Sequence, residues 1–334
     1  MTTGSHGRFT MDLPGAVQKF HIQPTPRVGG IGIYLGLLVA AFFMRDREAA
    51  EILATIVLAG LPALVVGLAE DVTKRVGVLT RLIATFLSGL LACWLSSVVL
   101  VQVDVSWFDA ALKTAPVAVV FTAFAIAGIA NSINIIDGFH GLASGTVVIC
   151  LTAIAIVAAS VGDTSLAICC ALVAAAIAGF WLLNFPWGKI FLGDGGAYFA
   201  GFALAWLAVL LPARNPGVSP WVSLLICAYP IVEVLYSIVR RGCERRSPGT
   251  PDRRHLHSLV ATGFVQQRFR GLHPTLQNST VSVIMWCVAA LPAALAVAFY
   301  RKPDLLVLHV GAFAAGYHFL YCLFARADVR TSRV

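Results

Sequence analysis

The chain has 334 residues, of which 59% are apolar and 12% are charged, and its mean hydropathy is +0.85. These values lie far outside the range of a soluble globular domain and indicate an integral membrane protein. The net charge of +8 fits the basic flanks of such a protein and its anionic lipid head groups, and nothing in the sequence resembles a nucleic-acid-binding module.

Ten apolar stretches, each of about 17 to 22 residues, alternate with short polar connections and are long enough to cross the bilayer as helices. They predict an all-α, polytopic membrane fold. We expect one helical transmembrane domain at 28–326, a cytoplasmic N-terminal segment at 1–27 and a tail at 327–334. The predicted spans are 28–44, 50–69, 82–101, 116–133, 141–160, 164–183, 196–212, 218–239, 280–299 and 304–324.

Basic residues are divided unevenly between the two ends of these spans. If residues 1–27 lie inside, 18 Lys and Arg residues face the cytoplasm and 6 face the opposite side. Because Lys and Arg near span ends favour the cytoplasm, the sequence predicts this orientation. The long polar loop at 240–279 then faces the cytoplasm, with nearly every ionisable residue suited to chemistry.

The first polar cluster on that side closes the second span. Glu70 and Asp71 end the apolar run, and Lys74 and Arg75 follow within about one helical turn. A solvated helix end with local ion pairs is one interpretation. The other is a pair of functional carboxylates beside a phosphate-binding lysine, and the pattern alone does not choose between them.

The second cluster ends the fourth span. Asn131, Asn134 and Asp137 recur at every third position, so they lie on one face of a helix before the glycine break at Gly138. A helix terminus with Asx-type capping is the plainer interpretation. A polar lining for a substrate is the functional one.

Two further clusters complete the set. Gly193-Asp194-Gly195-Gly196 places a lone carboxylate among glycines, and Arg254, His255 and His257 lie in the loop 240–279, where they are a functional group or a surface accident. Oxygen ligands without thiolates suit Mg²⁺ or Mn²⁺, and Arg and His suit phosphate oxygens. The four clusters together predict metal-assisted phosphoryl transfer.

Five elements stand in a recognisable order: Gln23-Pro24-Thr25-Pro26-Arg27-Val28-Gly29-Gly30, Glu70-Asp71 with Lys74, Asn131/Asn134/Asp137-Gly138, Phe191-Leu192-Gly193-Asp194-Gly195-Gly196, and His255-Leu256-His257. With them the chain resembles the polyprenyl-phosphate N-acetylhexosamine-1-phosphate transferases (glycosyltransferase family 4), which include the WecA-type and MraY-type enzymes. The resemblance implies transfer of a sugar 1-phosphate from a UDP-sugar to undecaprenyl phosphate, giving an undecaprenyl-diphospho-sugar and UMP. Such a reaction initiates a lipid-linked cell-surface glycan at the cytoplasmic face of the bacterial inner membrane.

The resemblance also implies roles for single residues. Asp194 and Asp137 would bind Mg²⁺ or Mn²⁺, and Asp71, supported by Glu70, would position or deprotonate the lipid phosphate. The implied substrate-binding residues are Lys74, Arg27, Asn131, Asn134, His140, Arg254, His255 and His257. Whether Asp71 is a base or an orienting anion stays open at this point.

The chain departs from the family pattern in several places. Glu70 stands where the family usually has aspartate, and His140 stands where it often has an acid or asparagine. We expect His140 to contact the sugar or a phosphate rather than the metal. Ser258 cuts short the histidine run of the muramoyl-pentapeptide branch, which favours the WecA-like branch. Members usually have one more span before the Pro-Thr-Pro-Arg segment, so the chain starts late or lacks that helix.

Other interpretations stay open. A transporter would need charges within several spans, whereas here Glu233 is nearly alone; this residue either approaches the site or makes a structural hydrogen bond. An inactive membrane scaffold of a glycan-assembly complex is a further alternative. The sugar is N-acetylglucosamine, N-acetylgalactosamine or a modified deoxysugar, and a homodimer is left open.

Overall fold

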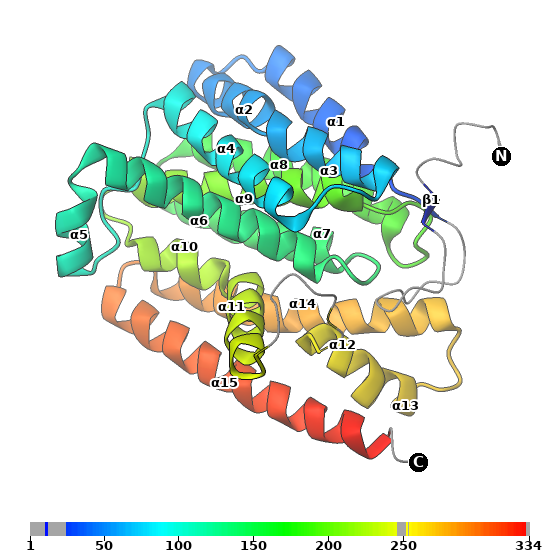
Figure 1. Cartoon of the computed structure of the whole chain (residues 1–334). Helices are drawn as coiled ribbons and strands as arrows, with labels where there is room; N and C mark the ends of the chain where they lie inside the picture. Colours follow the sequence, from blue (N-terminus) through cyan, green and yellow to red (C-terminus); the bar gives the residue numbers. More distant parts are fainter. Residues whose placement is uncertain (1–10, 13–24, 246–251, 253, 332–334) are drawn as a thin grey trace.

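The computed structural model describes residues 11–12, 25–245, 252 and 254–331, which form a bundle of helices (Figure 1). Two short strands, β1 (Met11–Asp12) and β2 (Thr25–Pro26), pair antiparallel before the bundle. The first half of the bundle consists of α1 (Gly29–Phe43), α2 (Arg47–Ala59), α3 (Leu61–Thr73), α4 (Val78–Ser96), α5 (Ser106–Leu112), α6 (Ala115–Ile136), α7 (Leu142–Ser160) and α8 (Thr164–Asn184). The second half consists of α9 (Gly193–Arg214), α10 (Pro220–Ile226), α11 (Ala228–Cys243), α12 (Leu256–Val260), the π-helix η2 (Ala261–Val265), α13 (Gln266–Arg268), α14 (Pro274–Phe299) and α15 (Pro303–Thr331).

Each of the ten predicted spans corresponds to helical structure. Within the described residues, eight helical segments are long and apolar enough to cross a membrane, counting α2 and α3 as one segment. The first predicted span is α1, which has 15 residues, and the eighth is the pair α10 and α11. The all-α, multi-pass membrane fold predicted from composition is confirmed.

The predicted span 218–239 is bent rather than one continuous helix. α10 and α11 meet at an angle of 77°. Pro230 has no N–H group, so it makes no helical hydrogen bond to the carbonyl of Ile226 four residues earlier. That carbonyl instead accepts a hydrogen bond from the thiol of Cys150 in α7, at 3.3 Å. The break therefore leaves the freed backbone group satisfied.

α9 is the axis of the bundle. Of its most apolar 18-residue window 89% is buried, against 33% for α4 and α8, and it packs on α1, α3, α6 and α7. A helix that is apolar on all sides belongs in a protein interior. Its glycines also permit close packing, since a Cβ on Gly201 would lie 2.8 Å from Cα of Ala130 in α6.

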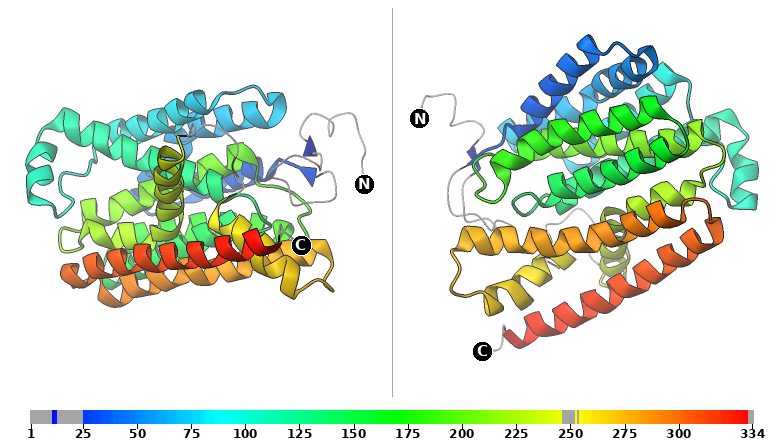
Figure 2. Two further views of the ribbon diagram at one scale, coloured as in Figure 1. Left: turned by 60° about the horizontal axis from the view of Figure 1, so that its bottom comes forward. Right: turned by 180° about the vertical axis from the view of Figure 1, so that it is seen from behind.

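The C-terminal helices α14 and α15 form a layer beside this axis. Figure 2 shows α14 and α15 side by side along one flank, with the short helices α12 and α13 next to α14. These short helices fall in the segment 240–279 that hydropathy describes only as a loop. α15 continues to Thr331 and so includes part of the predicted tail 327–334.

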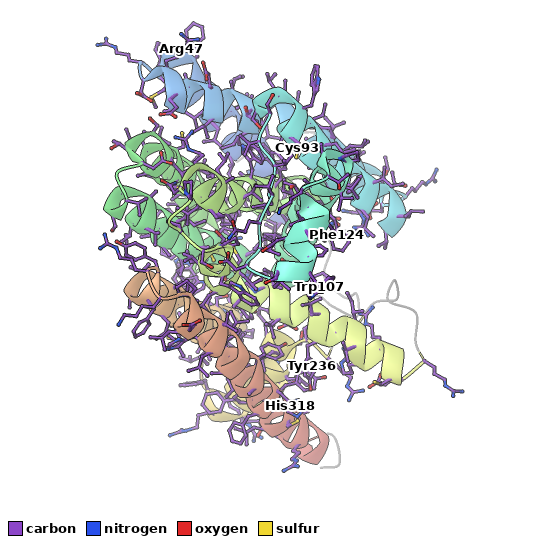
Figure 3. All side chains as sticks on the ribbon, turned by 90° about the vertical axis from the view of Figure 1, so that its left-hand side faces the viewer. Arg47, Cys93, Trp107, Phe124, Tyr236 and His318 are labelled. Carbon is purple, nitrogen blue, oxygen red and sulfur yellow. The ribbon has the colours of Figure 1, made fainter. Side chains whose placement is uncertain are left out.

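Apolar side chains cover the outer surface as well as the core. Figure 3 shows Trp107 of α5 and Phe124 of α6 on the periphery, where they are 77% and 67% exposed. Phe42 of α1 and Trp94 of α4 are 82% and 75% exposed. Apolar surface on this scale suits contact with lipid rather than water.

Candidate active site

The N-terminal motif and the glycine-rich motif are joined through their backbones. The N–H of Phe191 donates to the carbonyl of Pro26 at 2.9 Å, and the N–H groups of Gly29 and Gly30 donate to the carbonyls of Phe191 and Leu192 at 3.0 and 3.1 Å. Two segments far apart in sequence therefore run side by side. This pairing brings the side chain of Arg27 to the start of α9.

Glycine is required where α1, α3 and α9 converge. A Cβ on Gly30 would lie 2.4 Å from Cα of Gly196, and a Cβ on Gly67 would lie 2.5 Å from Cα of Gly195. Real Cβ atoms do not approach backbone this closely. The contacts are backbone to backbone, so no side-chain rotation relieves them, and they fix the carboxylate-bearing ends of α3 and α9 against each other.

Asp71 ends α3 and caps the start of α9. Its side chain is 1% exposed, and Oδ1 and Oδ2 accept the backbone N–H groups of Asp194 and Gly195, each at 3.0 Å. Nη1 of Arg27 lies 3.4 Å from Oδ1, and Nζ of Lys74 lies 3.9 Å from it. A carboxylate at a helix N-terminus satisfies free N–H groups and complements the helix dipole.

Asp194 is held by two arginines. Its Oδ2 accepts a hydrogen bond from Nη1 of Arg81 at 2.6 Å, and Oδ1 lies 4.0 Å from Nη1 of Arg27. Arg81 was not predicted as a site residue, because in the sequence it is one of the basic residues at the cytoplasmic span ends. The available signal was its place near the start of α4, the helix that follows the Glu70-Asp71 pair.

Glu70 contacts a different segment from Asp71. Its Oε2 accepts the backbone N–H of Val76 at 2.7 Å and so holds the turn between α3 and α4. Lys74 sits in that turn in the left-handed conformation, with φ of 55°. The longer Glu side chain reaches this turn, while its neighbour Asp71 faces α9.

The asparagine face of α6 splits between structure and site. Nδ2 of Asn131 donates to Oγ1 of Thr85 at 2.9 Å and ties α6 to α4, and the carbonyl of Asn134 accepts the N–H of Asp137 at 3.3 Å. Asp137 follows the last residue of α6. Burial, and then the charge of Asp194, raise the pKa of Asp137 to about 7. The two carboxylates are thus close enough to oppose each other's ionisation.

His140 braces the loop that leads to Asp194. Its backbone N–H donates to Oδ1 of Asn278 at 2.7 Å, and its Nδ1 lies 3.2 Å from the carbonyl of Pro186. The ring fills the space beside Gly188, where a Cβ would lie 2.5 Å from Nε2. Gly188 has φ of +62°, so both its backbone and its neighbour demand glycine.

The histidine motif reaches the same region from the second half of the chain. Nε2 of His257 lies 3.6 Å from where a Cβ on Gly138 would be, and its ring meets Phe139 edge to face at 5.6 Å. Burial lowers the pKa of His257 to about 4. Arg254 instead is half exposed and pairs with Glu244 at 2.7 Å. This ion pair does not involve Asp71, Asp137 or Asp194.

These features define a multi-pass helical membrane protein with carboxylates, guanidinium groups and histidines gathered at the N-terminal end of its central helix. The chain belongs to the family described as glycosyl transferase family 4, whose model matches residues 30–212. That match includes the acidic pair, the asparagine face and the glycine-rich motif.

Named relatives extend the comparison. The undecaprenyl-phosphate alpha-N-acetylglucosaminyl 1-phosphate transferase of Thermotoga maritima is 29% identical over 75% of this chain and 72% of its own length. A probable undecaprenyl-phosphate N-acetylglucosaminyl 1-phosphate transferase of Bacillus subtilis is 29% identical over 74% and 69%. The transferase of the same name as the first from Escherichia coli K12 is 28% identical over 75% and 69%. These similarities agree with the WecA-like branch.

Proposed function

We propose that the protein transfers N-acetylglucosamine 1-phosphate, or a related sugar 1-phosphate, from a UDP-sugar to undecaprenyl phosphate. An oxygen of the lipid phosphate attacks the sugar-linked phosphorus. The bond from that phosphorus to the bridging oxygen of the diphosphate breaks, and UMP leaves with that oxygen. The products are UMP and the undecaprenyl-diphospho-sugar that begins a lipid-linked glycan. The names of the relatives support undecaprenyl phosphate as the acceptor and N-acetylglucosaminyl 1-phosphate as the group transferred.

The observation that carries this proposal is the group formed by Asp71, Asp137, Asp194, Arg27 and Arg81. Three carboxylates and two guanidinium groups converge where α3, α6 and α9 have their polar ends. Bringing two phosphorylated substrates together requires that their repulsion be neutralised and their geometry be fixed. A site of mixed charge at the edge of a membrane meets that need.

Within this proposal Asp71 serves as an orienting anion. Both of its oxygens accept backbone N–H groups, and Arg27 and Lys74 approach the same carboxylate. Asp71 thereby places two cationic side chains where a lipid phosphate would bind. Ionised phosphate is already a nucleophile near pH 7, so its attack does not require a strong base.

A divalent cation fits the donor set at Asp194 and Asp137. Burial, and then the charge of Asp194, raise the pKa of Asp137 to about 7, and a cation between the two carboxylates would offset both effects. Among the described residues no three His, Cys, Asp or Glu side chains form a metal cluster, so phosphate and water oxygens would complete the shell, as is usual for Mg²⁺. When bound, Mg²⁺ or Mn²⁺ would neutralise charge on the diphosphate.

The remaining assignments follow from position. His255 and His257 would face the UDP-sugar diphosphate, with Asn134 and His140 nearby, and the site would face the cytoplasm of the inner membrane. Asn131 and Glu70 would support the site through Thr85 and Val76. A homodimer remains a prediction that cross-linking in membranes would test.

The test is an assay of the purified protein with undecaprenyl phosphate and a panel of UDP-sugars. We expect labelled UMP to exchange into UDP-N-acetylglucosamine and a diphospholipid product to form, each only with Mg²⁺ or Mn²⁺ present. A scaffold or transporter would support neither reaction. Product with another sugar would correct the substrate and keep the reaction.

A further inference from the structure

Glu233 is a buried acid that the reaction above does not use. It lies in α11, its side chain is 1% exposed, and α11 belongs to the bent pair that is long enough to cross the membrane. A charged side chain deep in a membrane helix costs up to about 3.5 kcal/mol on insertion scales. Such a residue needs a partner or a function.

Its partners are two groups at the start of the histidine segment. Oε1 of Glu233 lies 3.0 Å from Nδ1 of His255 and accepts the backbone N–H of Leu256 at 3.1 Å. Leu256 is the first residue of α12, so one carboxylate oxygen fixes both the imidazole ring and the helix start. Contacts of this kind set the direction of a ring more firmly than packing alone.

The contact also selects the tautomer of His255. An ionised carboxylate only accepts hydrogen bonds, so Nδ1 carries a proton and Nε2 is the nitrogen left for a ligand. Within the described residues, Nε2 of His255 makes no hydrogen bond.

His257 completes the arrangement. Its ring stacks on that of His255 with centroids 5.3 Å apart and planes at 7°, and its far side meets Phe139, two residues after Asp137. Because burial lowers the pKa of His257 to about 4, that ring is neutral at pH 7.

We propose that Glu233 is a positioning residue that holds the His255 ring with a proton on Nδ1 and so sets the direction in which the ring presents Nε2 to the nucleotide-sugar. The identity of that ligand rests on the proposed function, whereas the coupling of Glu233 to His255 does not. The groups that face Glu233 are His255 and His257, Tyr229 of its own helix, and Tyr317 of α15.

The first experiment reads the coupling without any activity. In protein labelled with ¹⁵N-histidine, the His255 resonances, assigned with His255→Asn, should show a proton on Nδ1. In Glu233→Gln the carboxylate is replaced by an amide that can also donate, so the preference of the proton for Nδ1 should weaken. A wild-type ring with its proton on Nε2 alone, or an unchanged proton position in Glu233→Gln, would overturn the inference, and the wild-type result decides even if the variant does not fold.

The second experiment uses the transferase assay. In Glu233→Gln, KM for the UDP-sugar should rise about tenfold with KM for undecaprenyl phosphate unchanged. Ser237→Ala, a buried change one turn further along α11, should keep the wild-type values. In a His255→Asn background, Glu233→Gln should add less than about twofold, since it acts through the absent ring.

The two outcomes separate cleanly. An inactive wild-type protein in which Glu233 sets the proton position of His255 would refute the proposed reaction and keep the role of Glu233 toward His255. An active wild-type protein in which Glu233→Gln lowers activity to the same degree in both backgrounds would show a structural role, and would overturn the inference.

Discussion

Asp71 holds Asp194 through the peptide backbone rather than through its side chain. Oδ1 of Asp71 accepts the N–H of Asp194 at 3.0 Å, while the Asp194 carboxylate turns to Arg81 at 2.6 Å. The two acids therefore have separate tasks. Asp71 fixes the start of α9, and the Asp194 carboxylate makes the side-chain contacts to Arg81 and Arg27.

This division predicts the effect of Asp194→Asn on stability and on turnover. Asp194→Asn should keep the wild-type melting temperature but reduce turnover by more than about a hundredfold, because an amide is a poor ligand for a hard dication. EDTA should silence the wild-type enzyme. Measurement of melting and of UMP exchange in the same detergent checks both statements. Activity within tenfold of wild type at saturating Mg²⁺ would remove Asp194 from the cation site.

The glycine contacts predict a pair of variants on one helix. Gly30→Ala should lower the melting temperature and abolish transfer, because its Cβ would lie 2.4 Å from Cα of Gly196. Gly32→Ala should be neutral or slightly stabilising, because nothing lies within 4 Å of its Cβ and alanine is the better helix former. Thermal unfolding of the two proteins side by side is the test. Equal stability would mean that α1 and α9 are not in this contact.

His140 should affect the sugar more than the metal. His140→Asn keeps a donor and an acceptor but loses the ring that contacts Gly188 and Pro186. We expect KM for the UDP-sugar, or the choice among sugars, to change while the Mg²⁺ activation curve stays near wild type. Metal and UDP-sugar titrations of the variant provide the comparison. A large shift in metal affinity with unchanged sugar kinetics would make His140 a ligand.

Membrane orientation is tested by labelling from either side. In a background without the eight cysteines, a cysteine at Lys189 should react only from the cytoplasm and one at Lys302 only from the opposite side. Both lysines are exposed, so reactivity reports position rather than burial. Labelling of the two positions from the same side would refute the topology on which the site's location depends.

An ion pair at the other end of the bundle predicts a pH dependence of stability. Asp163 accepts hydrogen bonds from Nε and Nη2 of Arg214 at 2.8 and 2.9 Å. Burial raises the pKa of Asp163, but the bonds from Arg214 and Asn215 outweigh it and the pKa is lowered. The stabilisation is therefore full above the unfolded pKa of about 3.9 and is lost as pH falls through the lower folded value. The melting difference between wild type and Asp163→Asn should be constant from pH 5 to 8 and shrink below about pH 4. A difference independent of pH would contradict this assignment.

Hydropathy was sufficient to predict the membrane helices because apolar length is what a bilayer selects. It missed the bend between α10 and α11, since the compensation for Pro230 comes from Cys150, a residue 80 positions away. The short strands and α12 were missed for the same reason: they depend on contacts with distant segments rather than on local pattern.

For the site, the motifs located the carboxylates but not their partners. Arg81 was missed because a basic residue near a span end is typical of topology alone. Asn131 shows the opposite case, since a polar residue on the expected face of α6 bonds to Thr85 instead. The polar residues of a sequence tell which chemistry is available, while only packing decides which of them face one another.

The glycine contacts at Gly30, Gly67 and Gly196 leave no intermediate between hydrogen and a full side chain. Relatives that diverge cannot widen the space between α1, α3 and α9 by small steps, so this frame is closed to gradual evolution. If the protein uses a nucleotide-sugar as proposed, we expect a change of sugar to arise in the segments that border the frame, namely the loop braced by His140 and the short helices after His255. Engineering of a new donor specificity would target the same two segments.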